Sequence, residues 1–257
     1  MSDIHYQIHS NSPDKPWIML IHGLFGSMDN LTALRRQLTE SYQILTVDLP
    51  DHGKSAHTTS ISFNRYCELL FKLVESLGIQ SINLIGHSLG GKVAMQFSLN
   101  HPNKVNHLVV LDIAPVAYAP RHNNVFKGLN NVKLGTIASR KEADTALSEY
   151  VTETSTRQFL LKSLYNENDS WQWRFNLALL EQDYPNISAA ITSSQAFGGK
   201  TLFIKGEHSD YLLPEHKSAV MELFPNSKSK MISGTGHWLH AEKPELCSKL
   251  IRAFLAK

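Results

Sequence analysis

Gly86-His87-Ser88-Leu89-Gly90 follows a short apolar run, Ile82 to Ile85, and precedes a segment with helical spacing of apolar residues, Lys92 to Asn100. The apolar run is typical of a strand buried on both faces of a sheet. Glycines two positions on either side of Ser88 allow a sharp strand-to-helix turn, because larger side chains there would collide. Such a turn presents a serine at a helix N-terminus, where free N–H groups favour a developing anion. We therefore predict a nucleophilic serine rather than a turn without chemistry.

Composition narrows the class of protein. The chain has 257 residues, 42% of them hydrophobic and 19% charged, with a formal net charge of +2. These values are ordinary for a globular protein, and no basic cluster indicates a nucleic-acid or acidic-membrane partner. Residues 1–12 are polar and lack a signal-like apolar segment, so we expect a cytoplasmic protein. Cys67 and Cys247 are expected to be buried thiols, and no spacing predicts a metal site.

The order of elements predicts an α/β fold. Strand-like runs alternate with helical segments up to residue 115, which predicts a mostly parallel sheet with helices on both faces. Residues 116–199 contain no strand-like run and are expected to form helices only, including 172–181 and 188–195. Strands resume at Lys200. We predict a core formed by residues 1–115 and 200–257, with residues 116–199 inserted as a helical cap or lid.

Ligands of a parallel sheet meet the carboxyl ends of its strands, so polar residues that follow strands are the candidates for chemistry. A serine hydroxyl needs a base, and the base needs a group that fixes its tautomer. His237 follows the last strand in a glycine-rich loop and is the predicted base; His240, nearby, is the less favoured one. Asp112 and Asp210 both have the chain order serine, acid, histidine, and we favour Asp112 because a carboxylate embedded in an apolar run needs a partner.

The negative charge of a tetrahedral intermediate needs hydrogen-bond donors. The backbone N–H of Leu89, which follows the serine, is one predicted donor. The second is expected in the loop after the strand Trp17 to His22, at the N–H of Leu24, where Gly23 and Gly26 permit a tight turn. His22 itself is expected to be structural.

Four motifs together resemble the α/β-hydrolase superfamily: His22-Gly23-Leu24-Phe25-Gly26, Asp48-Leu49-Pro50-Asp51-His52-Gly53-Lys54-Ser55, Gly86-His87-Ser88-Leu89-Gly90-Gly91 and Gly236-His237-Trp238. Three further stretches resemble the YbfF-like esterases, namely Leu111-Asp112-Ile113-Ala114-Pro115, Trp173-Arg174-Phe175-Asn176 and the segment from Gly236 to Pro244. The subfamily resemblance implies hydrolysis of short acyl esters and acyl thioesters, including acyl-CoA, without a cofactor. It also implies an acid after the earlier strand, which favours Asp112; Asp210 lies one residue beyond the usual Gly-x-x-Asp motif.

These observations predict a serine carboxylesterase or thioesterase that acts on a small-molecule substrate through an acyl-enzyme on Ser88. A serine at the turn argues against the dehalogenases and epoxide hydrolases of the superfamily, which have an aspartate there. Carbon–carbon bond hydrolysis and perhydrolysis on the same triad stay open as alternatives. So does a ligand-sensing or binding protein on a hydrolase fold, because the fold alone does not determine function.

Overall fold

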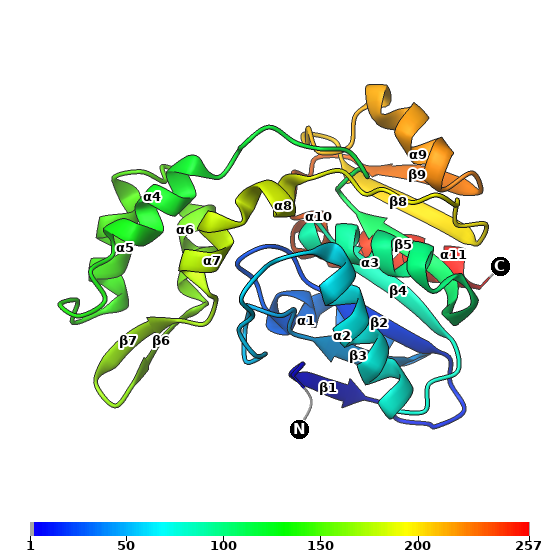
Figure 1. Cartoon of the computed structure of the whole chain (residues 1–257), viewed down its shortest axis with the longest axis horizontal. Helices are drawn as coiled ribbons and strands as arrows, with labels where there is room; N and C mark the ends of the chain where they lie inside the picture. Colours follow the sequence, from blue (N-terminus) through cyan, green and yellow to red (C-terminus); the bar gives the residue numbers. More distant parts are fainter. Residues whose placement is uncertain (1–2, 257) are drawn as a thin grey trace.

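The computed structural model describes residues 3–256 and has a seven-stranded sheet at its centre, in the order β1-β3-β2-β4-β5-β8-β9 (Figure 1). The strands are β1 Tyr6–His9, β2 Trp17–Ile21, β3 Gln43–Val47, β4 Ile82–His87, β5 Val105–Leu111, β8 Lys200–Gly206 and β9 Ser227–Ile232. The edge strand β1 is antiparallel to β3, and every other pair is parallel. The predicted mostly parallel sheet is confirmed.

Helices cover both faces of this sheet because its central strands β2, β3 and β4 are buried on both faces, whereas the edge strands β1 and β9 are largely exposed. The helices of the core are α1 Thr32–Leu38, α2 Phe63–Ser76, α3 Leu89–Asn100, α9 Lys217–Leu223, α10 Leu239–Glu242 and α11 Pro244–Leu255, with short 3-10 turns at Met28–Leu31, Pro102–Lys104 and Pro214–His216. In β2, Met19 and Ile21 pack into the cluster that contains α2 and α3, whereas Ile18 and Leu20 pack into the cluster that contains α1 and α11. Both cysteines are buried and free, as expected.

Residues 116–199 leave the sheet between β5 and β8, and most of them lie to one side of it (Figure 1). Their elements are α4 Asn123–Asn131, α5 Arg140–Ser148, α6 Thr154–Leu161, β6 Leu164–Glu167, β7 Ser170–Trp173, α7 Leu177–Gln182 and α8 Tyr184–Ser188. We call this part the cap. That the cap and the core are separate domains, with boundaries at residues 115/116 and 199/200, stays a prediction.

The expectation of an all-helical cap is wrong at two places. A hairpin, β6–β7, occupies part of the helix expected over 172–181, and its tip residues Asn168 and Asp169 both have positive φ, 50° and 59°. Asn and Asp tolerate this conformation, which suits a two-residue hairpin turn, so the signal was present in the sequence. The helix expected over 188–195 is absent, because α8 begins at Tyr184, with Pro185 in its first turn, and ends at Ser188.

The strand order places two loops side by side above the sheet. From β2 the chain continues to β3 on one side, while β4 pairs with the other side of β2 and leads on to β5. Strand order reverses here, and parallel sheets bind ligands at such a point. The loop after β2, which carries Leu24, and the turn after β4, which carries Ser88, therefore emerge as neighbours. Within residues 3–256, no helix has the length and apolar character needed to cross a membrane.

Candidate active site

Ser88 occupies the turn between β4 and α3 with a backbone that few non-glycine residues adopt, φ 54° and ψ −118°. The glycines around it are required by close packing. A Cβ on Gly86 would lie 2.1 Å from the carbonyl oxygen of Gly90, and a Cβ on Gly90 would lie 2.3 Å from that of Ile21. The turn is therefore closed to side chains at both positions, for the steric reason that the sequence suggested.

Asp112 follows β5 and is completely buried. Its Oδ2 accepts a hydrogen bond from Nδ1 of His237 at 2.7 Å, and its Oδ1 accepts one from the backbone N–H of Gly206 at 3.0 Å. The hydroxyl of Ser209 also donates to Oδ2. The loop that carries His237 crosses the end of β8 closely, because a Cβ on Gly206 would lie 2.1 Å from the carbonyl oxygen of Gly236. This close crossing brings the histidine after β9 to the carboxylate after β5.

The alternative residues have other surroundings. The Asp210 side chain is 68% exposed and its Oδ1 accepts a hydrogen bond from Nη1 of Arg121 at 2.6 Å. His240 is buried, and its Nδ1 has no hydrogen-bond partner among the residues that the structure describes. Burial, assisted by the neighbouring His237, lowers the pKa of His240 to about 3. The structure thus brings Asp112 and His237 together and leaves Asp210 and His240 outside that contact.

His237 contacts Asp112, His87 and Tyr211. Besides Asp112 at Nδ1, its carbonyl oxygen accepts a hydrogen bond from Nε2 of His87 at 2.9 Å. Burial and the adjacent histidines hold the pKa of His87 well below its ordinary value, so His87 is a neutral donor. The ring of Tyr211 stacks on the imidazole, with 4.0 Å between ring centroids and 24° between planes. Within residues 3–256, Nε2 of His237 has no hydrogen-bond partner.

The loop after β2 is a tight turn, in which the N–H of Gly26 donates to the carbonyl of Gly23 at 3.1 Å and Phe25 has a positive φ of 61°. His22 fixes this loop from below. Its Nε2 accepts from the N–H of Leu49 at 3.0 Å, so Nδ1 carries the proton and donates to the carbonyl of Gly23 at 2.8 Å. Burial lowers the pKa of His22, which keeps the ring neutral and supports the structural interpretation.

Asp48, another polar residue at a strand end, also organises the loops. Its carboxylate accepts from the N–H groups of Met28 and Lys54 and from Nδ1 of His5. Although burial alone would raise the pKa of Asp48, His22 and these donors lower it. Among residues 3–256, no group of three or more His, Cys, Asp or Glu side chains is placed to hold a metal ion.

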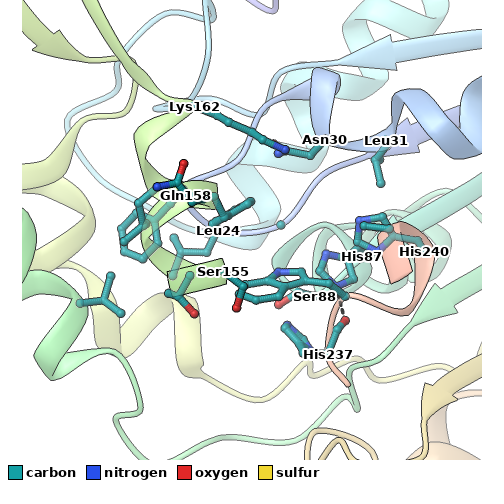
Figure 2. Close-up of a pocket in the computed structure, with 18 of the residues that line it drawn as sticks. Leu24, Asn30, Leu31, His87, Ser88, Ser155, Gln158, Lys162, His237 and His240 are labelled. Atoms are coloured by element: carbon teal, nitrogen blue, oxygen red, sulfur yellow. Dashed lines mark hydrogen bonds between the residues drawn. The ribbon is translucent and has the colours of Figure 1, made fainter. Parts of the chain in front are cut away.

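Two cavities meet at Ser88. The larger has a volume of about 320 Å³ and is lined by Ser88, His237 and Trp238 of the core and by residues of α6 in the cap. Figure 2 shows Ser88 and His237 toward one end of this cavity, with Asn30 and Lys162 toward the other. The smaller, of about 40 Å³, is lined by Ser88 and Leu89 together with residues at the base of the cap. Leu24 lines both cavities.

Lys92 lies in the first turns of α3 and is almost completely buried. Its Nζ donates to the carbonyl of Val116 at 3.0 Å and to those of Ser188 and Ala189 at 3.1 and 2.5 Å. These carbonyls belong to the segment that leads into the cap (residues 116–122, the outgoing segment) and the segment that leads out of it (residues 188–199, the returning segment). Burial lowers the pKa of Lys92 to about 7. Lys92 therefore joins the helix behind Ser88 to both ends of the cap.

Sequence reasoning missed Lys92, Tyr211 and the partner of Asp210. A lysine on an otherwise apolar helix was a usable signal for Lys92, because a buried cation needs acceptors. The contact between Phe159 of α6 and Trp238, 5.5 Å between centroids, joins two segments far apart in the chain and had no such signal.

Comparison with known proteins agrees with this geometry. Residues 16–244 match the family model described as alpha/beta hydrolase fold. The chain is 37% identical to a putative esterase/lipase of Haemophilus influenzae, over 99% of this chain and 88% of that protein. It is 35% identical to esterase YbfF of Escherichia coli, over 96% and 94% of the two chains. A solved marine microorganism esterase superposes with a TM-score of 0.95 at 33% identity, covering 99% of this chain and all of the other. The chain therefore belongs to the α/β-hydrolase fold family and has YbfF-like esterases among its relatives.

Proposed function

We propose that this protein is a serine hydrolase of carboxylic esters and thioesters that works through an acyl-enzyme on Ser88. Ser88 Oγ attacks the acyl carbonyl while Nε2 of His237 takes its proton, and Asp112 holds the resulting imidazolium through Nδ1–H. The imidazolium then donates that proton to the leaving oxygen or sulfur. In the second half, His237 takes a proton from water, hydroxide adds to the acyl carbonyl, and Ser88 leaves with the proton returned.

The single observation that carries this proposal is the 2.7 Å hydrogen bond between Nδ1 of His237 and buried Asp112, where His237 lines the same cavity as Ser88. The proposed donors to the oxyanion are the N–H groups of Leu24 and Leu89. Leu89 is the first residue of α3, where an N–H has no helical acceptor, and the loop of Leu24 adjoins Ser88. Names of the related proteins, esterase and esterase/lipase, support ester hydrolysis.

The two cavities suggest which part of the substrate goes where. The leaving atom must reach His237 to be protonated, and His237 lines the 320 Å³ cavity. The acyl group then points into the other cavity, of about 40 Å³, whose lining includes Ile113, Ile187 and Tyr211. Since this volume holds only a few heavy atoms, we propose a short acyl group esterified to a larger alcohol or thiol. The cap, which supplies walls to both cavities, is proposed to select the substrate.

The alternatives differ in what they turn over. A ligand sensor on this fold would bind an ester and hydrolyse it slowly, whereas carbon–carbon hydrolysis and perhydrolysis would use the same triad on other substrates. Ester hydrolysis is favoured by the related esterases and by a cavity wide enough for a leaving group beside His237.

The test is turnover of nitrophenyl esters with acyl chains of increasing length, alongside the matching acyl-CoA thioesters. We expect turnover of acetyl to butanoyl esters, a sharp fall for longer chains, and no turnover by Ser88→Ala. A fluorophosphonate probe should add one label, which Ser88→Ala abolishes and Ser27→Ala, in the neighbouring loop, retains. Ester turnover by a folded Ser88→Ala variant would refute the nucleophile assignment, and flat dependence on acyl length would refute the assignment of the small cavity.

A further inference from the structure

The loop after β8 carries an aromatic residue, Tyr211, that lines the smaller cavity but has no part in the proton transfers described above. Half-buried Tyr211 follows Asp210, and its ring lies nearly parallel to the imidazole of His237 at 4.0 Å between centroids. Asp112 holds the Nδ1 corner of that imidazole, while His87 donates to the backbone carbonyl of the residue and places its own ring 4.8 Å from the imidazole, tilted by 45°. A hydrogen bond at one corner and a tilted ring contact restrain the imidazole plane less than a ring that stacks on its face.

The Tyr211 ring is itself held by the cap. The hydroxyl of Tyr118, in the outgoing segment, donates a hydrogen bond to the carbonyl of Tyr211 and accepts one from the N–H of Ala114 at 2.9 Å. The rings of Tyr118 and Tyr211 are in contact, at 5.5 Å between centroids. Arg121, also in the outgoing segment, places its guanidinium 4.8 Å from the centre of the Tyr211 ring while pairing with Asp210. Tyr118 and Arg121 of the cap therefore both contact Tyr211, which lies beside His237.

We propose that Tyr211 is a positioning residue for His237, and that Tyr118 and Arg121 hold Tyr211 in place from the base of the cap. The inference rests on the proposed function, since it gives His237 the role of the base. The ring keeps the imidazole plane aligned between Asp112 and Ser88. Its π face also stabilises the imidazolium that forms when the serine loses its proton, as an aromatic face does for any cation placed over it. Asp210 then serves the base indirectly, by pairing with Arg121.

The electrostatic surroundings of His237 define what the test must hold constant. The groups near it are Asp112 from the end of β5, His87 from β4, His240 from α10 and His122 from the outgoing segment, while the Arg121 guanidinium lies against the ring of Tyr211. Burial lowers the pKa of His122 to about 4, so His122 is neutral near neutral pH. A substitution at Tyr211 changes none of these charges.

The experiment compares Tyr211→Leu with Tyr211→Phe, which keeps the ring and loses only the hydroxyl. With enzyme concentrations set by active-site titration, we expect Tyr211→Leu to lower kcat about tenfold with little change in KM. Its acid limb of kcat/KM should move about one pH unit lower, because the imidazolium loses its stacked partner. Tyr211→Phe should keep at least half of kcat and the original limb. Loss of stability alone would change neither titrated kcat nor the pH profile.

Three outcomes would overturn the proposal: an unchanged kcat and limb in Tyr211→Leu, a rise in KM alone, or an equal loss in both variants. If Tyr211→Leu does not fold, Tyr118→Phe provides the test, because it removes one hydroxyl and no charge. We expect its kcat to fall about threefold, and an unchanged kcat would contradict the proposal that Tyr118 holds Tyr211 in place. The comparison first requires that the wild-type enzyme hydrolyses the ester and that Ser88→Ala does not. If this requirement is not met, the proposed function is refuted, which is a separate result from a failure of the Tyr211 variants to behave as expected.

Discussion

Asp112→Asn and Asp210→Asn should have very different effects on turnover, although both replace a carboxylate in a loop that follows a strand. Asp112 is fully buried and accepts hydrogen bonds from His237, Gly206 and Ser209. Asparagine has the same shape but no charge. When its NH2 group faces Nδ1 of His237, that nitrogen must accept, so the imidazole carries its proton on Nε2 and is in the wrong tautomer to act as a base. The loss expected for a neutral residue at this position of a triad is about 10⁴-fold in kcat, equivalent to about 5 kcal/mol of transition-state stabilisation.

The effect at Asp210 should be small. Its side chain is 68% exposed and makes one ion pair, with Arg121. Exposed ion pairs contribute about 0–1 kcal/mol, so even a complete transfer of that energy to the transition state would change kcat by less than about fivefold. The two variants should therefore differ by about three orders of magnitude or more.

The assay is kcat on nitrophenyl acetate between pH 7 and 8, with circular dichroism to establish that both variants are folded. Asp112→Asn leaves one buried donor without an acceptor, which costs about 1–3 kcal/mol of stability and lowers the melting temperature without abolishing the fold. Retention of more than a tenth of wild-type kcat by Asp112→Asn, or an equal loss in Asp210→Asn, would refute the assignment of Asp112 as the acid.

Three further perturbations address the cap and the buried histidines. Lys92→Met leaves carbonyls of the outgoing and the returning segment without a donor, so we expect faster proteolysis within residues 116–199 and a several-fold rise in KM. The control is Lys127→Met, at an exposed lysine of the cap. Equal cleavage rates in the two variants would contradict the role given to Lys92. Phe159→Ala removes the ring contact with Trp238 and should raise KM about two- to tenfold for esters with large leaving groups but not for methyl esters. An equal rise in KM for both kinds of ester would refute the assignment of Phe159 to the leaving-group cavity. His52 and His240 have pKa values lowered by burial to about 3, against 6.5 when unfolded, so the unfolded chain binds more protons below pH 6.5 and stability falls as the pH drops from 6.5 toward 3. These two groups alone should remove about 3 kcal/mol between pH 6.5 and 5. A melting temperature that does not change over that interval would show that the two rings are not buried in the neutral form.

The sequence predicted the sheet well because its strands carry short apolar runs that few other structures accommodate. It predicted Ser88 as the residue of the strand-to-helix turn for a related reason, since only glycine fits at positions 86 and 90. The loop after β9 could be placed over the sheet from its glycines, and the apolar run around Asp112 favoured it over Asp210 without excluding Asp210. The choice between the two depends on the crossing of Gly236 over Gly206, which is a contact between segments that do not adjoin in the chain.

The cap was predicted as an insertion but not in its details. Apolar spacing located α4, which spans Asn123–Asn131, because an amphipathic helix has one buried face. It failed at the β6–β7 hairpin, whose strands have four residues each and carry little periodic signal. The contacts of Tyr211 and Lys92 could not be predicted because each depends on where the two ends of the cap meet the core.

The attachment of both cap ends to Lys92 determines how substrate exchange can occur. An element tied to one helix at both of its ends rotates about that attachment, and its outlying parts travel farthest. Rotation of this kind would separate Phe159 of α6 from Trp238 and break the hydrogen bond from the Ser163 hydroxyl to the carbonyl of Phe25, while the contacts at Val116 and Ala189 persist. It would open the larger cavity along α6, so a leaving group and the incoming water would share that opening.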